Sequence, residues 1–187
     1  MKRFLFIAIA ISLFATGGAF GNRGTARNND FARAGDIGQF AIPFSALLYT
    51  AVIGDWQGAK QFGFSTTSTL AVTYALKYTV RAERPYQDKG AKGHSFPSGH
   101  TAFAFAGAGY WQRRYGWWVG VPMYAAASAV GYSRVFSRNH NWADVVAGAA
   151  IGTGFNYLFT TRYVPKGTQI AAVPTEGGAM LRFNSTF

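Results

Sequence analysis

Five long apolar segments with very few charged residues constrain the fold of this chain more than any other feature of its sequence. They span residues 40–53, 62–80, 98–111, 117–132 and 141–159. Each is longer than an ordinary strand of about 5–6 residues, and proline falls mostly at the segment edges. The sequence therefore predicts an all-α fold, a compact helical bundle with about five core helices.

The composition leaves open whether this bundle lies in a membrane. Charged residues make up only 13% of the chain, about half of the usual ~25%. The glycine, alanine, serine and threonine of the apolar segments suit close helix packing in a bilayer. The mean hydropathy of +0.04 is nevertheless low for a protein with several membrane spans. A membrane-embedded bundle and a soluble or peripheral bundle both remain open.

The net charge and the absence of cysteine narrow the function classes. The formal net charge is +11, which favours solubility or attraction to anionic lipid headgroups. The basic residues are scattered and form no recognised nucleic-acid motif, so we expect no nucleic-acid partner. A chain without cysteine has no disulfide, no zinc-thiolate site and no cysteine nucleophile.

The two ends of the chain differ from its centre. Lys2 and Arg3 precede an apolar run and then small residues up to Ala19, so segment 1–19 is either a cleaved signal peptide or a membrane anchor that forms a sixth helix. Both interpretations place the protein in the cell envelope, exported or facing outward. The composition then predicts a polar loop over 20–37, the helical bundle over 38–162 and an extended tail over 163–187. Within that tail, 169–173 and 179–187 look β-like.

The first polar motif is a pair of cations near the end of the second apolar segment. Lys77 and Arg84 are seven residues apart, which is two helical turns, so they can share one helical face. Pro85 ends the helix directly afterwards. Two cations at the end of a helix suit the helix dipole and can also bind an anion.

The second motif begins the third apolar segment. Ser98 follows Phe96 and Pro97 and is a favoured N-cap residue. Gly99 allows a ligand to approach the free backbone N–H groups of the first helical turn, a natural binding place for phosphate. His100 lies in the same turn and is suited to donate a proton near neutral pH.

The third motif joins the last two apolar segments. Ser133 and Arg134 end one helix, and His140 and Asp144 lie at the start of the next. The i, i+4 spacing places His140 and Asp144 on one helical face. A carboxylate bonded to one imidazole nitrogen leaves the other nitrogen free to attack as a nucleophile.

Together these motifs resemble the type-2 phosphatidic-acid phosphatase family, whose superfamily also includes bacterial non-specific acid phosphatases and vanadium haloperoxidases. The pattern K-x6-RP stands at 77–85, PSGH at 97–100 and SR-x5-H-x3-D at 133–144. Every motif position matches in order and spacing, and the resemblance covers about residues 40–160.

The resemblance implies a role for each motif residue. His140 is the expected nucleophile and forms a phosphohistidine, Asp144 orients it, and His100 protonates the leaving alcohol and later activates water. The phosphoryl oxygens are expected to bind Lys77, Arg84, Ser98, Gly99 and Arg134. No metal or other cofactor is expected, because three cationic side chains take the role that Mg²⁺ has elsewhere.

The predicted function is therefore a metal-independent phosphatase that acts on phosphomonoester or pyrophosphate groups, chiefly of lipid phosphates. With the N-terminus inside, the Arg113–Arg114 pair falls on the cytoplasmic side and the three motifs fall together on the periplasmic side. A non-specific periplasmic acid phosphatase, a vanadium-dependent haloperoxidase and a non-catalytic anion-binding envelope protein are the alternatives. The sequence does not indicate the oligomeric state.

Overall fold

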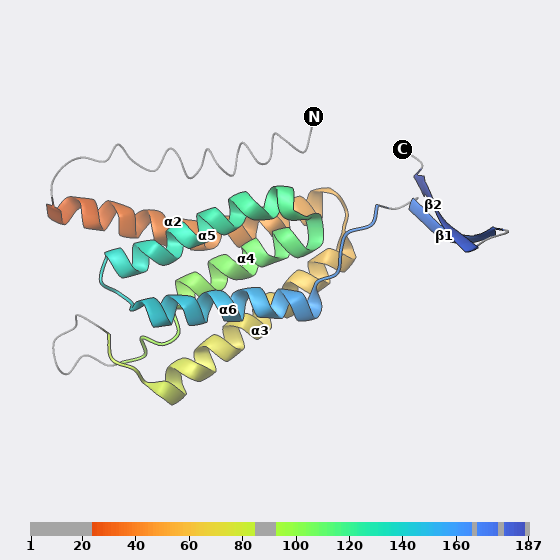
Figure 1. Cartoon of the computed structure of the whole chain (residues 1–187). Coiled ribbons are helices and arrows are strands. Elements are labelled where there is room, and N and C mark those ends of the chain that lie inside the picture. Colours follow the sequence, from red (N-terminus) through yellow and green to blue (C-terminus); the bar gives the residue numbers. More distant parts are fainter. Residues whose placement is uncertain (1–23, 85–92, 166–167, 176–177, 186–187) are drawn as a thin grey trace.

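A computed structural model describes residues 24–84, 93–165, 168–175 and 178–185. The five helices are α2 (Gly24–Val52), α3 (Trp56–Val80), α4 (Gly99–Tyr115), α5 (Trp117–Phe136) and α6 (Trp142–Phe159). They form a bundle (Figure 1), so the prediction of a five-helix bundle is confirmed for the described residues. Segment 1–19, predicted to be a signal peptide or a sixth helix, lies outside these residues.

The extended tail forms an antiparallel hairpin. Strand β1 (Thr168–Thr175) pairs with β2 (Gly178–Ser185) in a continuous register, with Thr168 opposite Ser185. The β-like character predicted for this tail is thus confirmed, and the hairpin follows the helical bundle in Figure 1.

The polar loop predicted over 20–37 is wrong from residue 24 onward, because α2 already begins there. Within its polar and glycine-rich first half, residues 31–36 pack on the bundle. Gly35 and Gly38 are buried, and Asp36 forms an ion pair with Arg134 of α5. Tertiary contacts therefore outweigh the low helix propensity of glycine and asparagine in this segment.

Side chains at the first residues of three helices determine where each helix begins. The Gly58 N–H of α3 donates to Asp55 Oδ1 at 2.9 Å, and the Thr101 N–H of α4 donates to Ser98 Oγ at 3.4 Å. At the start of α6, the Asn141 N–H donates to Asp144 Oδ2 at 3.0 Å. Such caps satisfy N–H groups that have no partner inside the helix.

Helix α4 occupies the centre of the bundle and contacts each of the other four helices. Its most extensive contact is with α6, where small residues allow the two backbones to approach closely. A Cβ atom on Gly148 would lie 2.6 Å from the Ser98 carbonyl oxygen, and one on Gly152 would collide with the Ala102 carbonyl oxygen. The register of α4 against α6 therefore depends on these two glycines.

A buried ion pair joins the start of α3 to the last turn of α4, far from the first turns of α4 and α6. Arg114 Nη2 donates to Asp55 Oδ1 at 2.5 Å and Arg114 Nε donates to Asp55 Oδ2 at 2.7 Å. Both side chains are 4% exposed. Burial works against the charged carboxylate, yet the hydrogen bonds from Arg114 and Gly58 hold the pKa of Asp55 below its ordinary value.

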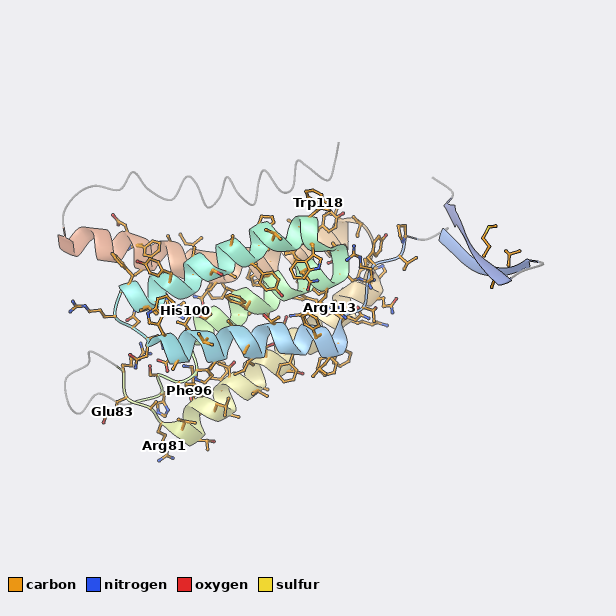
Figure 2. The ribbon with its side chains drawn as sticks, viewed as in Figure 1. Arg81, Glu83, Phe96, His100, Arg113 and Trp118 are labelled. Atoms are coloured by element: carbon orange, nitrogen blue, oxygen red, sulfur yellow. The ribbon has the colours of Figure 1, made fainter. Side chains whose placement is uncertain are left out.

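The surface of the bundle carries many large apolar side chains. Trp111 is in the core, whereas Trp117 and Trp118 are exposed, Trp118 by 94%. Figure 2 shows Trp118 and Arg113 at one end of the bundle and His100 at the other. Among the described residues, no helix combines the length and the hydropathy that a membrane span requires.

Replacing Arg114 with alanine should lower the free energy of unfolding by about 3–5 kcal/mol, because the Asp55 carboxylate would stay buried without a cation. Denaturant unfolding followed by circular dichroism measures this loss. Arg113→Ala is the matched control. The Arg113 guanidinium lies 4.5 Å from the centre of the Tyr157 ring, a contact worth about 0.5–1 kcal/mol. Equal losses in the two variants would contradict the importance of the buried pair.

Candidate active site

The three sequence motifs meet at one end of the bundle. The C-terminal ends of α3 and α5 lie there beside the N-terminal ends of α4 and α6, and a cavity of about 550 Å³ opens between them. Six of the eight predicted site residues line the cavity: Lys77, Arg84, Gly99, His100, Arg134 and His140. The other two, Ser98 and Asp144, are buried next to lining residues.

His140 and Asp144 form the pair that their spacing predicted. His140 Nδ1 lies 3.3 Å from Asp144 Oδ2, which leaves His140 Nε2 available for chemistry at the cavity. Burial and the nearby Lys77 charge lower the pKa of His140 to about 4, and they outweigh the opposite effect of Asp144. The imidazole is therefore neutral at pH 7, the form in which a ring nitrogen can act as a nucleophile.

Ser95 belongs to the same cluster, although the sequence analysis assigned it no role. Its side chain is fully buried. The Ser95 hydroxyl donates to Asp144 Oδ2 at 2.5 Å and lies 3.3 Å from His140 Nδ1. Asp144 Oδ2 thus accepts from the Ser95 hydroxyl and the Asn141 N–H as well as facing His140. The only sequence signal for Ser95 was its place three residues before Ser98.

His100 makes a second histidine–carboxylate pair, with Asp36 of α2. His100 Nε2 lies 3.0 Å from Asp36 Oδ1. Burial and the charge of Arg134 lower the pKa of His100, and Asp36 opposes that shift. Asp36 was not predicted as a site residue, because residues 20–37 have the composition of a polar loop. The family resemblance covers about residues 40–160, so no motif pointed to Asp36.

The three predicted phosphate-binding cations surround the cavity from two helices and the segment after α3. Lys77 Nζ donates to the carbonyl oxygens of His94 and Ser95, at 3.0 and 3.4 Å. Burial and the charge of Arg84 lower the pKa of Lys77. Arg134 Nη1 donates to Asp36 at 2.7 Å. These contacts hold Lys77 and Arg134 in place before any anion binds.

Ser98 is the one predicted phosphate ligand that the structure uses for another purpose. It is fully buried and is not part of the cavity lining. Its Oγ accepts hydrogen bonds from the Thr101 N–H and the Thr101 hydroxyl. Gly99, the next residue, does line the cavity. The first turn of α4 therefore faces the cavity with its backbone at Gly99 rather than with the Ser98 side chain.

A family comparison agrees with this arrangement. The profile of the PAP2 superfamily matches residues 58–167. The chain belongs to this superfamily. All the motif residues of the predicted site lie inside the matched segment, whereas α2, which supplies Asp36, lies before it.

Individual relatives support the same assignment. The chain is 33% identical over 143 residues to the lipid A 4'-phosphatase of Helicobacter pylori, covering 71% of this chain and 70% of that protein. It is 36% identical over 109 residues to the lipid A 1-phosphatase of Porphyromonas gingivalis, of which it spans 24%. The crystal structure of LpxE from Aquifex aeolicus has the same fold, with a TM-score of 0.62, 21% identity, and coverage of 79% of this chain and 92% of that one.

Ser95→Ala should move the acidic limb of the kcat/KM profile to higher pH. Loss of the hydroxyl that donates to Asp144 strengthens the hold of this carboxylate on His140, which raises the pKa of His140. Below that pKa the histidine is protonated and cannot attack. The measurement is a pH profile of phosphate release by the wild type and the variant.

Ser128→Ala is the matched control for this experiment, because Ser128 is exposed on α5. Its profile should overlay that of the wild type. An unchanged acidic limb in Ser95→Ala would show that the Ser95 hydroxyl does not influence His140.

Proposed function

We propose that this protein is a phosphatase that removes phosphate from a lipid phosphomonoester through a phosphohistidine on His140. The observation that carries the proposal is the buried pair of His140 and Asp144, with its neutral imidazole, in one cavity with three cations and a second histidine. Such a set can hold a phosphoryl group, attack it and protonate the leaving oxygen.

In the first step, His140 Nε2 attacks phosphorus while the bond from phosphorus to the leaving oxygen breaks. Asp144 and Ser95 hold the opposite ring nitrogen, so the attacking nitrogen is oriented before substrate arrives. Protonated His100 gives its proton to the leaving oxygen, which departs as an alcohol. The phosphoryl group is then bonded to His140.

In the second step, His100 is neutral and takes a proton from water as that water attacks phosphorus. The nitrogen–phosphorus bond breaks, inorganic phosphate forms, and His140 returns to its neutral state. His100 ends the cycle protonated, so protons and electrons balance. A histidine with a pKa near the working pH is suited to this change from acid to base.

Lys77, Arg84 and Arg134 supply the positive charge that phosphoryl transfer requires. Charge on the equatorial oxygens is stabilised most by cations that are already fixed in position, because no reorganisation is then needed during the reaction. The hydrogen bonds of Lys77 and Arg134 within the protein support such a role. The Gly99 N–H at the start of α4 is a further donor suited to an anion.

The cavity supports a substrate larger than free phosphate. Its volume of about 550 Å³ lies within the ~300–1,000 Å³ of small-molecule sites. The lining includes Phe40, Leu70, Tyr74 and Phe103, and Phe40 and Tyr74 are also exposed at the surface. A cavity lined by both apolar side chains and cations suits a lipid phosphate. The names of the relatives point to a phosphate group of lipid A.

We also propose that the protein acts in the cell envelope, in contact with lipid. Exposed aromatic side chains gather at both ends of the bundle: Tyr78, Tyr132, Phe136 and Trp142 near the cavity, and Trp56, Trp117, Trp118 and Tyr157 at the other end. Exposed aliphatic and phenylalanine side chains lie between them, including Phe44, Leu47, Leu48, Phe64 and Val146. Apolar patches of this extent are typical of interaction surfaces, and aromatic belts of membrane interfaces.

Purified protein should release phosphate from lipid A and phosphatidic acid in detergent, with EDTA present, and release less from a water-soluble aryl phosphate. His140→Ala should lower this release by about three orders of magnitude or more, because the nucleophile is lost. Ser128→Ala, an exposed change on α5 away from the cavity lining, is the control. It should keep activity within a few-fold of the wild type.

Other outcomes of this panel separate the alternatives. Equal release from the soluble ester would indicate a non-specific acid phosphatase. Near-normal activity in His140→Ala would exclude the phosphohistidine route. No release from any substrate would leave halide oxidation with added vanadate, or anion binding without catalysis, as the functions to test.

Expressed in cells, the protein should sediment with membranes and float with liposomes of anionic lipid. The exposed apolar side chains and the positive net charge both favour binding to such a surface. Replacing Trp117 and Trp118 together with serine should weaken flotation. Ser128→Ala, an exposed change on α5 that alters no charge, should have little effect. Recovery of the wild type in the soluble fraction without detergent would contradict lipid contact.

A further inference from the structure

Helix α2 brings a carboxylate to the cavity from outside the segment that the family profile matches. The profile begins at residue 58, whereas Asp36 lies on α2. Besides Asp36, α2 lines the cavity with Ala32, Gln39 and Phe40. The motif residues of the superfamily therefore do not account for everything that surrounds the proposed proton donor.

The docking of α2 against α5 is close at this point. A Cβ atom on Gly35 would lie 3.0 Å from Ser133 Cβ and would collide with the Ser133 hydroxyl and the Arg134 guanidinium. The Ala32 carbonyl oxygen accepts a hydrogen bond from Arg134 Nη2. A glycine at position 35 thus allows the turn that carries Asp36 to sit directly on Arg134.

Asp36 Oδ1 is shared by two groups that the reaction needs. It lies 3.0 Å from His100 Nε2 and 2.7 Å from Arg134 Nη1. Arg134 is 4% exposed, so its guanidinium is held among these partners, while Asp36 is 51% exposed at the mouth of the cavity. One carboxylate oxygen thereby ties the first turn of α4 to the last turn of α5.

These contacts leave donors for a substrate. A guanidinium has five N–H groups, and Arg134 engages Ser133 through Nε, Asp36 through Nη1 and Ala32 through Nη2. Two of its N–H groups remain. A protonated imidazole has two N–H groups, and the bond of Nε2 to Asp36 leaves Nδ1 for the leaving oxygen. Asp36 can therefore stay in place while substrate binds.

We propose that Asp36 is a positioning residue for the proton donor His100, holding the imidazole ring against Arg134 and favouring its protonated form. This proposal rests on the phosphatase function proposed above. The charged groups that face His100 are Arg134 from α5, Lys77 from α3 and Asp36 itself. Arg84 and His140 line the same cavity. Asp36 is the negative charge among them that bonds directly to His100.

The test is Asp36→Asn, which keeps the shape of the side chain and removes its charge. At pH 8 the variant should lose about tenfold in kcat/KM on an alkyl phosphate such as phosphatidic acid, part of the ~10²–10⁴ that a general acid contributes. On p-nitrophenyl phosphate, whose leaving group needs little protonation, the loss should be less than about threefold. In the pH profile of kcat/KM on the alkyl phosphate, the basic limb should move to lower pH.

A double-mutant cycle separates positioning from a general structural effect. In a His100→Ala background, Asp36→Asn should cause no further loss on either substrate, because the group through which it acts is absent. Asp30→Asn is the matched control, since Asp30 is an exposed carboxylate on the same helix. Asp30→Asn should have the wild-type kcat/KM on both substrates. Additive losses in the cycle would overturn the proposal.

An NMR titration of His100 in the absence of substrate tests the inference independently of the phosphatase function. The His100 ring resonance, assigned with His100→Ala, should titrate at lower pH in Asp36→Asn than in the wild type or Asp30→Asn. An unchanged titration would overturn the proposal even if the protein is a phosphatase. Tighter binding of inorganic phosphate with faster turnover in Asp36→Asn would also overturn it, because Asp36 would then be an anion that competes with substrate. Absence of phosphate release by the wild type would instead count against the proposed function.

Discussion

The close approach of α4 and α6 is the packing constraint on which the candidate site depends. Gly148 and Gly152 allow the α6 backbone to lie against that of α4, and the Ser98 N–H donates to the Asp144 carbonyl oxygen at 2.9 Å. That bond joins the first turns of the two helices. His100 and His140, which belong to these turns, therefore open onto one cavity, and a bulkier residue at either glycine would separate them.

The cavity keeps an excess of positive charge, from Lys77, Arg84 and Arg134, that can attract an anion. Burial keeps His140 neutral, and Lys77 adds to that effect. Asp144 is buried next to His140 and does not line the cavity, and Asp36 is half exposed at the cavity mouth. Neither carboxylate therefore neutralises all the cations around the cavity. Donors fixed by hydrogen bonds within the protein need little reorganisation when charge develops on a phosphoryl group.

Much of the bundle could be predicted because its helices are long, apolar and bounded by capping residues or proline. The eight predicted site residues do gather at one end.

Two features of the structure could not be predicted from the sequence. The first half of α2 looked like a loop because glycine and asparagine have low helix propensity. Its contacts with α5, through Phe31, Gly35 and Asp36, favour the helix. Ser95 carried no signal of its own, since its role depends on an aspartate 49 positions later.

The sequence by itself determined the family and the helical class, and it predicted which side chains react, because motif spacing and apolar periodicity are local properties of the chain. The tertiary structure alone decided which partners those side chains have. It directs the Ser98 hydroxyl to a helix cap, adds Ser95 to the pair of His140 and Asp144, and brings Asp36 to His100. Such partners are set by the approach of separate helices, and no spacing along the chain records that approach.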